Sequence, residues 1–381
     1  MRAQLSRDAA AWGREWRADW PAHILDRYRI DLGTEFMGRA VPHPIGKGSG
    51  QLSLRAEQLE ADADAGLAFT VLKTLIAQDE RGEQSMAAWA VHESKMRVER
   101  RATHDGREGW TVTWKGRGWD RSLDEYLALV RAARDLDRAG RLFAVPSVKY
   151  HLPAADEPFR TAEYAFTTRA LEAAWGDAPL FLEKDFSPTL AGDARADERA
   201  AVLRWLREVP GQIRTAAQGP VRLGVKVMNG RFDDAFQREM LAAAAGADFL
   251  TVFNRLWDPE AGVAYGGWDL SDRNLRVLDS TPGSSRRPAL PLSGTGNVCS
   301  GRMIVEYARR GCSTVQLHTV FQLPLSAYTA AAGSRPARAL HALVFDRADG
   351  LLEVLLELEE QGVLHRRGGV LHFRDLVASA A

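Results

Sequence analysis

The clearest chemical signal in this sequence comes from lysine, because the chain uses so few of them. Its 381 residues include 43 arginines and 7 lysines. Where arginine is the default cation, a lysine indicates a position that needs a compact charge with an adjustable pKa. Five lysines stand at or near the end of an apolar run: Lys47, Lys73, Lys149, Lys184 and Lys226. We expect their amines to stabilise negative charge or act as nucleophiles at one end of a sheet, the alternative being chance placement on a solvated rim.

Two glycine-rich turns could bring backbone against a ligand. Gly46-Lys47-Gly48-Ser49-Gly50 carries three glycines, so a flat ring could lie directly on it. Ser293-Gly294-Thr295-Gly296 follows an apolar run and precedes a segment with helical apolar spacing, so its amides could face a phosphate. Each turn also has a simpler interpretation. The first could be a flexible surface turn, and the second an ordinary strand-to-helix turn in which glycine only relieves steric crowding.

The elements that would position these residues follow a repeating pattern of apolar run, loop and amphipathic helix. Eight runs are predicted to be strands: 41–45, 68–72, 142–148, 180–182, 221–227, 249–253, 289–292 and 314–317. Helices are predicted at 54–65, 123–139, 197–209 and 235–245. Eight such units predict an α/β fold, a (β/α)8 TIM barrel, with its site at the C-terminal strand ends.

The barrel is expected over residues 36–345, with additions at both ends and one insertion. Residues 1–35 are predicted to be a helical extension, in which Trp12, Trp16 and Trp20 indicate a packing stripe or an oligomer contact. An insertion at 85–119 has alternating polarity about an Asp105-Gly106 turn, which predicts a β-hairpin that roofs the site. The tail, 346–381, is predicted to be a helix followed by a short hairpin.

Composition excludes several classes of function. The chain is 45% apolar and 26% charged with a net formal charge of zero, so nothing predicts binding to nucleic acid or to an anionic membrane. Cys299 and Cys312 cannot build a disulfide framework, and no Cys/His spacing predicts a metal site. No apolar run approaches about 18 residues, and the N-terminus has no apolar leader segment, so a cytoplasmic protein is expected.

The chain resembles dihydroorotate dehydrogenases and related FMN barrels over residues 35–345. The family's (I/V)-G-x-G-G-I loop corresponds to residues 294–298, and its Q-(I/V)-G-T segment to residues 316–319. The sequence GLAFTVLKTL is similar to the family's second strand, and LGVKV to its fifth, each with a lysine that meets the flavin. Two departures are clear, because Asn297 and His318 stand where the family has glycine.

The resemblance implies FMN as the cofactor and assigns residues to it. The residues that would line the flavin ring are Gly48, Ser49, Gly50, Lys73, Thr74 and Lys226. The residues that would hold its phosphate are Gly266, Gly267, Gly294, Thr295, Gly296, His318 and Thr319. A fixed cation beside the ring would stabilise the negative charge of the reduced flavin. The family also pairs often, so a homodimer is compatible with this resemblance.

The resemblance further implies a reaction. Ser187, before Pro188, matches the family's catalytic base, and Lys73 would act with it. The substrate residues would be Lys184, Thr189, Asn254 and Arg255. Most asparagine amides that recognise a pyrimidine are absent, so we expect an oxidoreductase acting on CH–CH or C=C bonds of a small polar molecule other than orotate. The alternatives are a binding barrel without chemistry, and an aldolase-type barrel that uses Lys73 or Lys226 as a Schiff-base nucleophile.

Overall fold

The central feature of the fold is one parallel sheet. The computed structural model describes residues 1–87, 97–102, 108–114, 118–186, 198–230, 233–258, 263–266, 270–279, 290–330 and 332–378. The sheet strands, in chain order, are β4 (Ile45–Lys47), β5 (Phe69–Val71), β6 (Leu75–Ile76), β9 (Phe143–Val145), β10 (Ser147–Lys149), β11 (Leu180–Asp185), β12 (Val221–Met228), β13 (Phe249–Asn254), β16 (Leu292–Gly294) and β17 (Cys312–Leu317). Their order in the sheet is β6-β10-β11-β12-β13-β16-β17-β4-β5-β9.

Two pairs of these strands, β5 with β6 and β9 with β10, follow each other closely in the chain with a short break between them. Residues 72–74 separate β5 from β6, and Pro146 separates β9 from β10. Hydrogen bonds continue across both breaks, from Leu72 N to Val145 O at 2.9 Å and from Glu183 N to Pro146 O at 2.9 Å. The predicted α/β class is therefore confirmed, as a ten-stranded parallel sheet with helices that is compatible with an α/β barrel.

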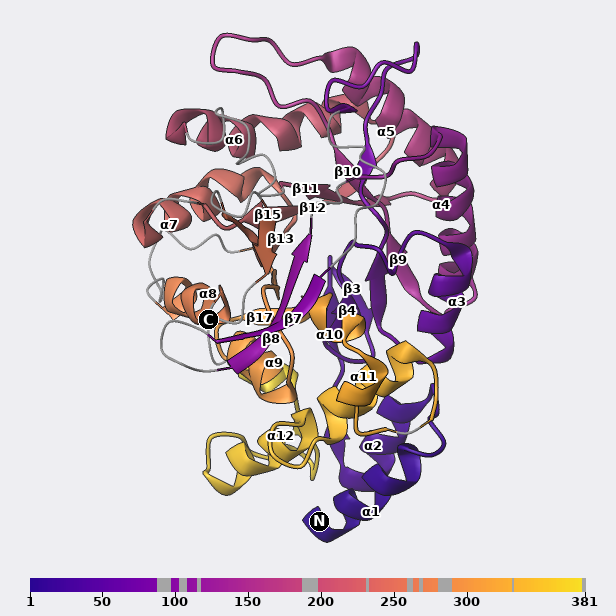
Figure 1. Cartoon of the computed structure of the whole chain (residues 1–381), viewed down its shortest axis with the longest axis vertical. Coiled ribbons are helices and arrows are strands. Elements are labelled where there is room, and N and C mark those ends of the chain that lie inside the picture. Colours follow the sequence, from indigo (N-terminus) through magenta and orange to yellow (C-terminus); the bar gives the residue numbers. More distant parts are fainter. Residues whose placement is uncertain are drawn as a thin grey trace.

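Helices cover the outside of this sheet (Figure 1). They are α3 (Ala56–Asp64), α4 (Leu123–Arg138), α5 (Thr161–Trp175), α6 (Arg199–Ala216), α7 (Asp234–Ala243), α8 (Leu270–Asp279) and α9 (Gly301–Ala308). Each helix from α3 to α7 contacts the next one along the chain. The predicted end of α6 at Val209 was wrong. The helix continues through Pro210 because Ile213 and Ala216 extend the buried stripe of Val209.

Two predicted strands are displaced by a few residues. The first sheet strand begins at Ile45, whereas Val41 ends β3 (Arg39–Val41), which pairs with β2 (Thr34–Phe36) in a hairpin. The seventh begins at Leu292 instead of 289. Val41 belongs with the hairpin because it packs beside Phe36 in a cluster with interior rings of the sheet. Phe36 stacks on Phe69 with ring centroids 3.7 Å apart, so this hairpin fills the space where the strands begin.

The terminal segments pack on one another. The predicted N-terminal helices are α1 (Arg2–Trp12) and α2 (Trp20–Tyr28). Trp12 lies 5.6 Å from the ring of Phe345 in α11 (Arg335–Phe345), and Trp20 is fully buried, which confirms a packing stripe. The tail contains α12 (Leu351–Glu360), β18 (Leu371–His372) and α13 (Arg374–Ala378). Its turn carries one antiparallel bridge, Arg367–Val370, and β18 then pairs in parallel with β1 (Ile30–Asp31).

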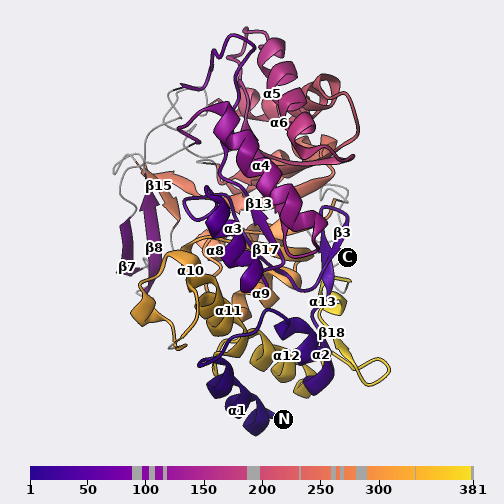
Figure 2. The ribbon, with the colours of Figure 1, turned by 90° about the vertical axis from the view of Figure 1, so that its right-hand side faces the viewer.

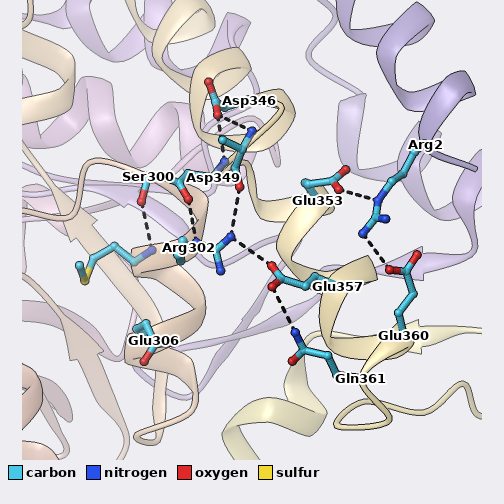
Figure 3. A network of polar contacts seen from close by, with 12 residues as sticks. Arg2, Ser300, Arg302, Glu306, Asp346, Asp349, Glu353, Glu357, Glu360 and Gln361 are labelled. Carbon is cyan, nitrogen blue, oxygen red and sulfur yellow. Dashed lines mark hydrogen bonds and ion pairs between the residues drawn. The ribbon is translucent and has the colours of Figure 1, made fainter.

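A polar network ties α9 to α12 and to the N-terminus (Figure 3). Arg302 of α9 donates from Nε to Asp349 at 2.7 Å and from a terminal nitrogen to Glu357 at 3.1 Å. Arg2 pairs with Glu353 at 2.5 Å and with Glu360 at 2.9 Å. Side chains of α12 thus hold α9, which follows the glycine turn of β16.

A second, antiparallel sheet has the order β14-β15-β8-β7. The predicted hairpin is confirmed as β7 (Arg97–Ala102) paired with β8 (Glu108–Trp114), while its turn at Asp105-Gly106 lies outside the described residues. The sequence did not reveal β14 (Leu256–Asp258) and β15 (Val263–Gly266), which follow β13 and extend this hairpin through β8. Figure 2 shows β7 and β8 on the side opposite to β3 and the C-terminus. No helix in the described part of the chain is long and apolar enough to cross a membrane.

Candidate functional site

All five strand-end lysines are buried, with exposed fractions between 0 and 5%. The prediction that they avoid a solvated rim is therefore confirmed. They do not all face the same side, however. Lys47 pairs with Asp62 of α3 and also donates to the carbonyl oxygen of Leu52 at 3.3 Å, while Thr70 donates to the second oxygen of Asp62 at 2.9 Å. Lys47 thus faces a helix.

Lys184 also lies away from the other amines. Successive side chains of a strand point to opposite faces, so along β11 Glu183 and Asp185 share one face and Lys184 takes the other. Its ammonium donates to the carbonyl oxygen of Asp185 at 3.1 Å and lies 4.6 Å from the ring centre of Phe186. Lys184, predicted to bind substrate, is fully buried on the face opposite to Glu183 and Asp185.

The remaining charged strand-end residues and one asparagine form what we call the strand-end cluster: Lys73, Lys149, Asp185, Lys226, Asn254 and Arg255. Its centre is Asp185, at the end of β11. Lys149 Nζ lies 3.3 Å from Asp185 Oδ2, and Asn254 Nδ2 donates to Asp185 Oδ1 at 3.3 Å. Strand register also sets Asp185 opposite Lys226 of β12. Groups from four neighbouring strands therefore meet around one carboxylate.

A buried polar network surrounds Glu183, which precedes Asp185 by two residues on β11 and lies on the same face of the strand. Gln316 of β17 donates through Nε2 to Glu183 Oε2 at 2.6 Å and to Thr251 Oγ1 at 3.0 Å. Thr251 of β13 donates to the same Glu183 oxygen at 3.1 Å. The other side-chain oxygens, Glu183 Oε1 and Gln316 Oε1, have no hydrogen-bond partner among the described residues. Burial raises the pKa of Glu183, although the nearby charge of Lys226 opposes the shift.

Lys226 faces the first glycine turn. A Cβ placed on Gly48 would lie 3.6 Å from Lys226 Nζ and 3.6 Å from Gln316 Oε1, with no closer neighbour. Beside it, Ser49 Oγ is 2.8 Å from Thr74 Oγ1, which in turn donates to Asp185 Oδ2 at 3.4 Å. The structure thus brings together Gly48, Ser49, Thr74 and Lys226, as the resemblance implied, and adds Asp185 to them.

The electrostatics follow from this crowding of cations. Burial, together with the charges of Lys149 and Arg255, lowers the pKa of Lys73 to about 7. Burial also lowers the pKa of Arg255 to about 10 against the attraction of Asp185. Burial alone would raise the pKa of Asp185, but Lys149 and Lys226 outweigh it and hold the value below the usual range. Asp185 is therefore an anion, and Lys73 loses its proton more readily than an exposed lysine.

The imidazole ring of His318 lies against the first glycine turn. A Cβ added to Gly50 would overlap the imidazole ring of His318, so this ring already covers the Gly50 backbone. Burial, with Arg255 and Lys226 nearby, lowers the pKa of His318 well below its ordinary value, so the imidazole is neutral. Of the two glycines expected to line a flavin, Gly48 has Lys226 and Gln316 at van der Waals distance from the Cβ it lacks, and Gly50 is covered by imidazole.

The second glycine turn is shaped largely by packing. A side chain on Gly294 would strike the ring of Tyr307, and Gly296 has a φ of +106° that disfavours other residues. The simpler interpretation of these two glycines is thus supported. Thr295 Oγ1 donates to the carbonyl oxygen of Gln316 at 2.8 Å. Asn297, 7% exposed, has an Nδ2 donor without a partner among the described residues.

The other predicted residues lie as follows. Thr319 begins α10 (Thr319–Gln322), directly after His318. Gly266 ends β15 in the antiparallel sheet, opposite Val112. Ser187, Thr189 and Gly267 lie outside the described residues, so the structure does not place them.

Sequence reasoning missed the carboxylates and the amide of the site. No role was assigned to Asp185 or Glu183, Lys149 was noticed only as a rare lysine, and Gln316 was matched only as the first residue of the family's Q-(I/V)-G-T segment. The alternation of a strand could have found the two carboxylates, because Glu183 and Asp185 share a face just where an apolar run ends. The contact of Gln316 with Glu183 could not be foreseen, since it joins residues 133 positions apart.

Two comparisons of the chain with known proteins found no match. No protein-family model matches the chain, and no curated protein sequence matches it either. The function is therefore argued from the site.

Proposed function

We propose that the parallel sheet closes into a (β/α)8 barrel, which binds FMN at its C-terminal strand ends and works as an oxidoreductase. Closure is supported by the pairing of the ten segments. Counting β5 with β6 as one strand, and β9 with β10 as another, gives eight strands, each paired in parallel with two neighbours. The interior contacts of Glu183 with strands β13 and β17 support it as well, because these strands are separated from β11 along the sheet.

The observation that carries the proposal is the approach of Lys226 to Gly48. Lys226 Nζ and the unpartnered Gln316 Oε1 each lie 3.6 Å from the Cβ position that Gly48 lacks, so a cation and an acceptor flank this glycine, which supports a planar ring lying there. Lys73 would meet the same ring from the end of β5. The residues present therefore fit the ring of FMN at Gly48, and His318 restricts the fit at Gly50.

The phosphate would lie at the loops after β16 and β17. The unpartnered Asn297 Nδ2 supplies one buried donor, and helix α9 begins after it in the chain, at Gly301. Anions are stabilised at such helix starts because backbone amides there lack intrahelical partners. The donor of Asn297 takes the role that a further backbone amide has in the resembled family.

The chemistry that bound FMN would supply is acceptance of a hydride from a substrate carbon, with a second acceptor taking up the electrons, or, in the reverse direction, donation of a hydride to an activated C=C bond, with a second electron donor restoring the reduced flavin. Lys73 and Lys226 would hold the negative charge that develops near them. Ser187 remains the proposed proton acceptor, and the hydroxyls of Ser49 and Thr74 connect the glycine turn to Asp185 by hydrogen bonds. Asn254 and Arg255 would contact the substrate beside Asp185.

Absorbance of the purified chain tests the proposal. Added FMN should be retained through desalting with the two visible bands of oxidised flavin, and Lys226→Met should weaken its binding at least about tenfold, because a buried charge-assisted contact is lost. Arg222→Gln, an exposed change in the same strand, is the control and should bind like wild type. A folded wild-type chain that takes up no FMN would contradict the proposal and favour a barrel without flavin chemistry.

One observation favours a second candidate, a lysine that forms a Schiff base. A buried amine beside other cations is a better nucleophile at neutral pH, and the pKa of Lys73 is lowered to about 7 by burial, Lys149 and Arg255. Borohydride trapping with a simple aldehyde, followed by peptide mass spectrometry, would label Lys73 in this case. Lys73→Arg keeps the charge but cannot form the adduct. Labelling spread over several lysines would speak against this candidate.

A further inference from the structure

We infer that the side chains of Gln316 and Lys226 bind the edge of a cyclic amide, on which an N–H group lies beside a carbonyl oxygen. Flavin carries such an edge on its pyrimidine ring, and a small cyclic imide carries the same edge. Where the occupant is FMN, the inference rests on the proposed function and names the contacts of the flavin ring. Where the occupant is a free imide, the inference stands without flavin.

The amide of Gln316 is held in one orientation. Its Nε2 donates to Glu183 Oε2 at 2.6 Å and to Thr251 Oγ1 at 3.0 Å. The hydroxyl of Thr251 donates its own proton to the same Glu183 oxygen at 3.1 Å. A reversed amide would set its oxygen against two oxygen atoms with no proton between them. The nitrogen of Gln316 therefore faces Glu183, and Oε1 points elsewhere.

The Oε1 atom of Gln316 is a buried acceptor that needs a donor. Gln316 is 1% exposed, and this oxygen has no hydrogen-bond partner among the described residues. Burying an acceptor without a donor is costly, so nearly all such atoms in folded proteins have a partner. Gln237 of α7, also buried, shows the usual arrangement, because it accepts from Gly230 N at 2.8 Å and donates to Met228 O at 2.9 Å. The contrast points to a ligand as the donor for Gln316 Oε1.

Lys226 supplies the opposite chemistry beside the same glycine. A Cβ on Gly48 would lie 3.6 Å from Lys226 Nζ and 3.6 Å from Gln316 Oε1, so the two groups flank this position. An ammonium group only donates hydrogen bonds, and an amide oxygen only accepts them. A ligand that satisfies both must offer an acceptor to Lys226 and an N–H group to Gln316.

A cyclic amide offers both groups on one edge. An open-chain secondary amide is trans, so its N–H and C=O groups point in opposite directions. The cis form is unfavourable in an open chain, but a ring enforces it. A carboxylate or phosphate would suit Lys226 but would place a second acceptor against Gln316 Oε1. A flat ring can also approach the backbone of Gly48 closely, because this residue has no side chain.

Two pairs of ligands test this inference on the full chain. FMN and 3-methyl-FMN differ in one N–H group, which a methyl group replaces, and so do succinimide and N-methylsuccinimide. Fluorescence titration measures the affinity of the flavins, and calorimetry of the flavin-free chain measures that of the imides. In at least one pair the N–H ligand should bind about tenfold or more tightly, because a buried acceptor rejects a ligand without the donor. Equal affinities within both pairs, or no binding of either pair, would overturn the inference.

Substitution of Gln316 shows whether its oxygen is responsible. Gln316→Ala removes the acceptor and makes room for the methyl group, so the preference for the N–H ligand should disappear. Gln237→Ala removes the buried glutamine of α7 and should keep the preference. A loss of stability alone weakens both members of a pair equally and leaves their ratio unchanged. A folded Gln316→Ala chain with the wild-type ratio would refute the role of this side chain.

A second variant covers the case in which Gln316→Ala does not fold. Glu183→Gln keeps the size of the network but no longer holds the nitrogen of Gln316 toward a carboxylate. The preference for the N–H ligand should therefore fall in this variant. An unchanged ratio in folded Glu183→Gln would count against the orientation argued for Gln316.

The two ligand pairs also separate this inference from the proposed function. Retention of FMN with a preference over 3-methyl-FMN supports both. Retention of FMN without a preference in either pair overturns the inference and leaves the proposed function standing. A chain that takes up no FMN but prefers succinimide to its methyl derivative has the amide site and lacks the proposed cofactor.

Discussion

The ammonium nitrogen of Lys149 lies 3.3 Å from a carboxylate oxygen of Asp185, so the ends of the neighbouring strands β10 and β11 are joined by an ion pair with exposed fractions of 3 and 7%. The pair fixes a negative charge among Lys73, Lys226 and Arg255. The site is thus organised around a carboxylate, although its most visible feature in the sequence is its lysines.

Breaking this pair should destabilise the protein strongly. Asp185→Asn leaves Lys149 without its carboxylate among other cations, and we expect the free energy of unfolding to fall by about 3–5 kcal/mol. Urea unfolding of Asp185→Asn, Lys149→Met and the double variant measures the interaction energy between the two side chains. The double variant should lose clearly less than the sum of the two single changes. Additive losses would show that the contact carries no interaction energy.

The ion pair of Lys47 should contribute to the stability of the chain and not to FMN binding. Its partner Asp62 is fully buried and also accepts from Thr70, so Lys47→Met leaves a buried carboxylate and should lower the free energy of unfolding by about 3–5 kcal/mol. The variant Lys47→Met/Asp62→Leu should recover most of this loss. FMN retention should stay at the wild-type level in the double variant, in contrast to Lys226→Met. Loss of FMN in a stable double variant would place Lys47 in the site.

The stability effects of substitutions at Gly50 and at His318 should compensate each other. Gly50→Ala places a methyl group where the imidazole ring lies, so it should destabilise the chain by about 1–3 kcal/mol through overpacking. His318→Ala removes the ring, and in that background Gly50→Ala should be nearly neutral. The thermal midpoints of the four proteins measure this coupling. Equal losses in both backgrounds would mean that the ring is not the obstacle. The variant His318→Ala should also retain FMN better, because it uncovers the Gly50 backbone.

The stability of the chain should rise with pH between about pH 7 and 9. Burial, with like charges nearby, lowers the pKa of Lys73 to about 7, and burial lowers the pKa of Lys184 to about 7. In this range the unfolded chain binds protons at these lysines that the folded chain does not, so unfolding becomes less favourable as the pH increases. Each lysine contributes at most about 1.4 kcal/mol per pH unit.

The variant Lys73→Met provides the check on this pH dependence. It should reduce the slope of the free energy of unfolding against pH by the share of one lysine, and Arg222→Gln should leave the slope unchanged. Urea unfolding at pH 7, 8 and 9 gives the three slopes. A wild-type chain whose stability is flat or falls over this range would show that both ammonium groups keep ordinary pKa values in the folded state.

The sequence by itself determined the alternation of strands and helices and the burial of the rare amines. Eight apolar runs, five of which lead to a lysine, each overlap a strand of the parallel sheet, because a buried parallel strand is apolar on both faces. Because residues before the first and seventh strands are apolar too, the apolar runs did not show where these two strands begin. Val41 is as apolar as Ile45, and only its packing beside Phe36 assigns it to the hairpin.

The tertiary structure alone decided which face each side chain takes and which distant residues meet. A one-residue step along a strand moves a side chain to the other face, so Lys184 lies opposite to Asp185 although the two are adjacent. Lys47 contacts Asp62 and Gln316 contacts Glu183 because strand register and helix packing set them together. Those contacts depend on sequence separations of 15 and 133 residues, which no local pattern encodes. Residue type thus indicated that charge would be buried, and three-dimensional pairing decided which groups each charge contacts.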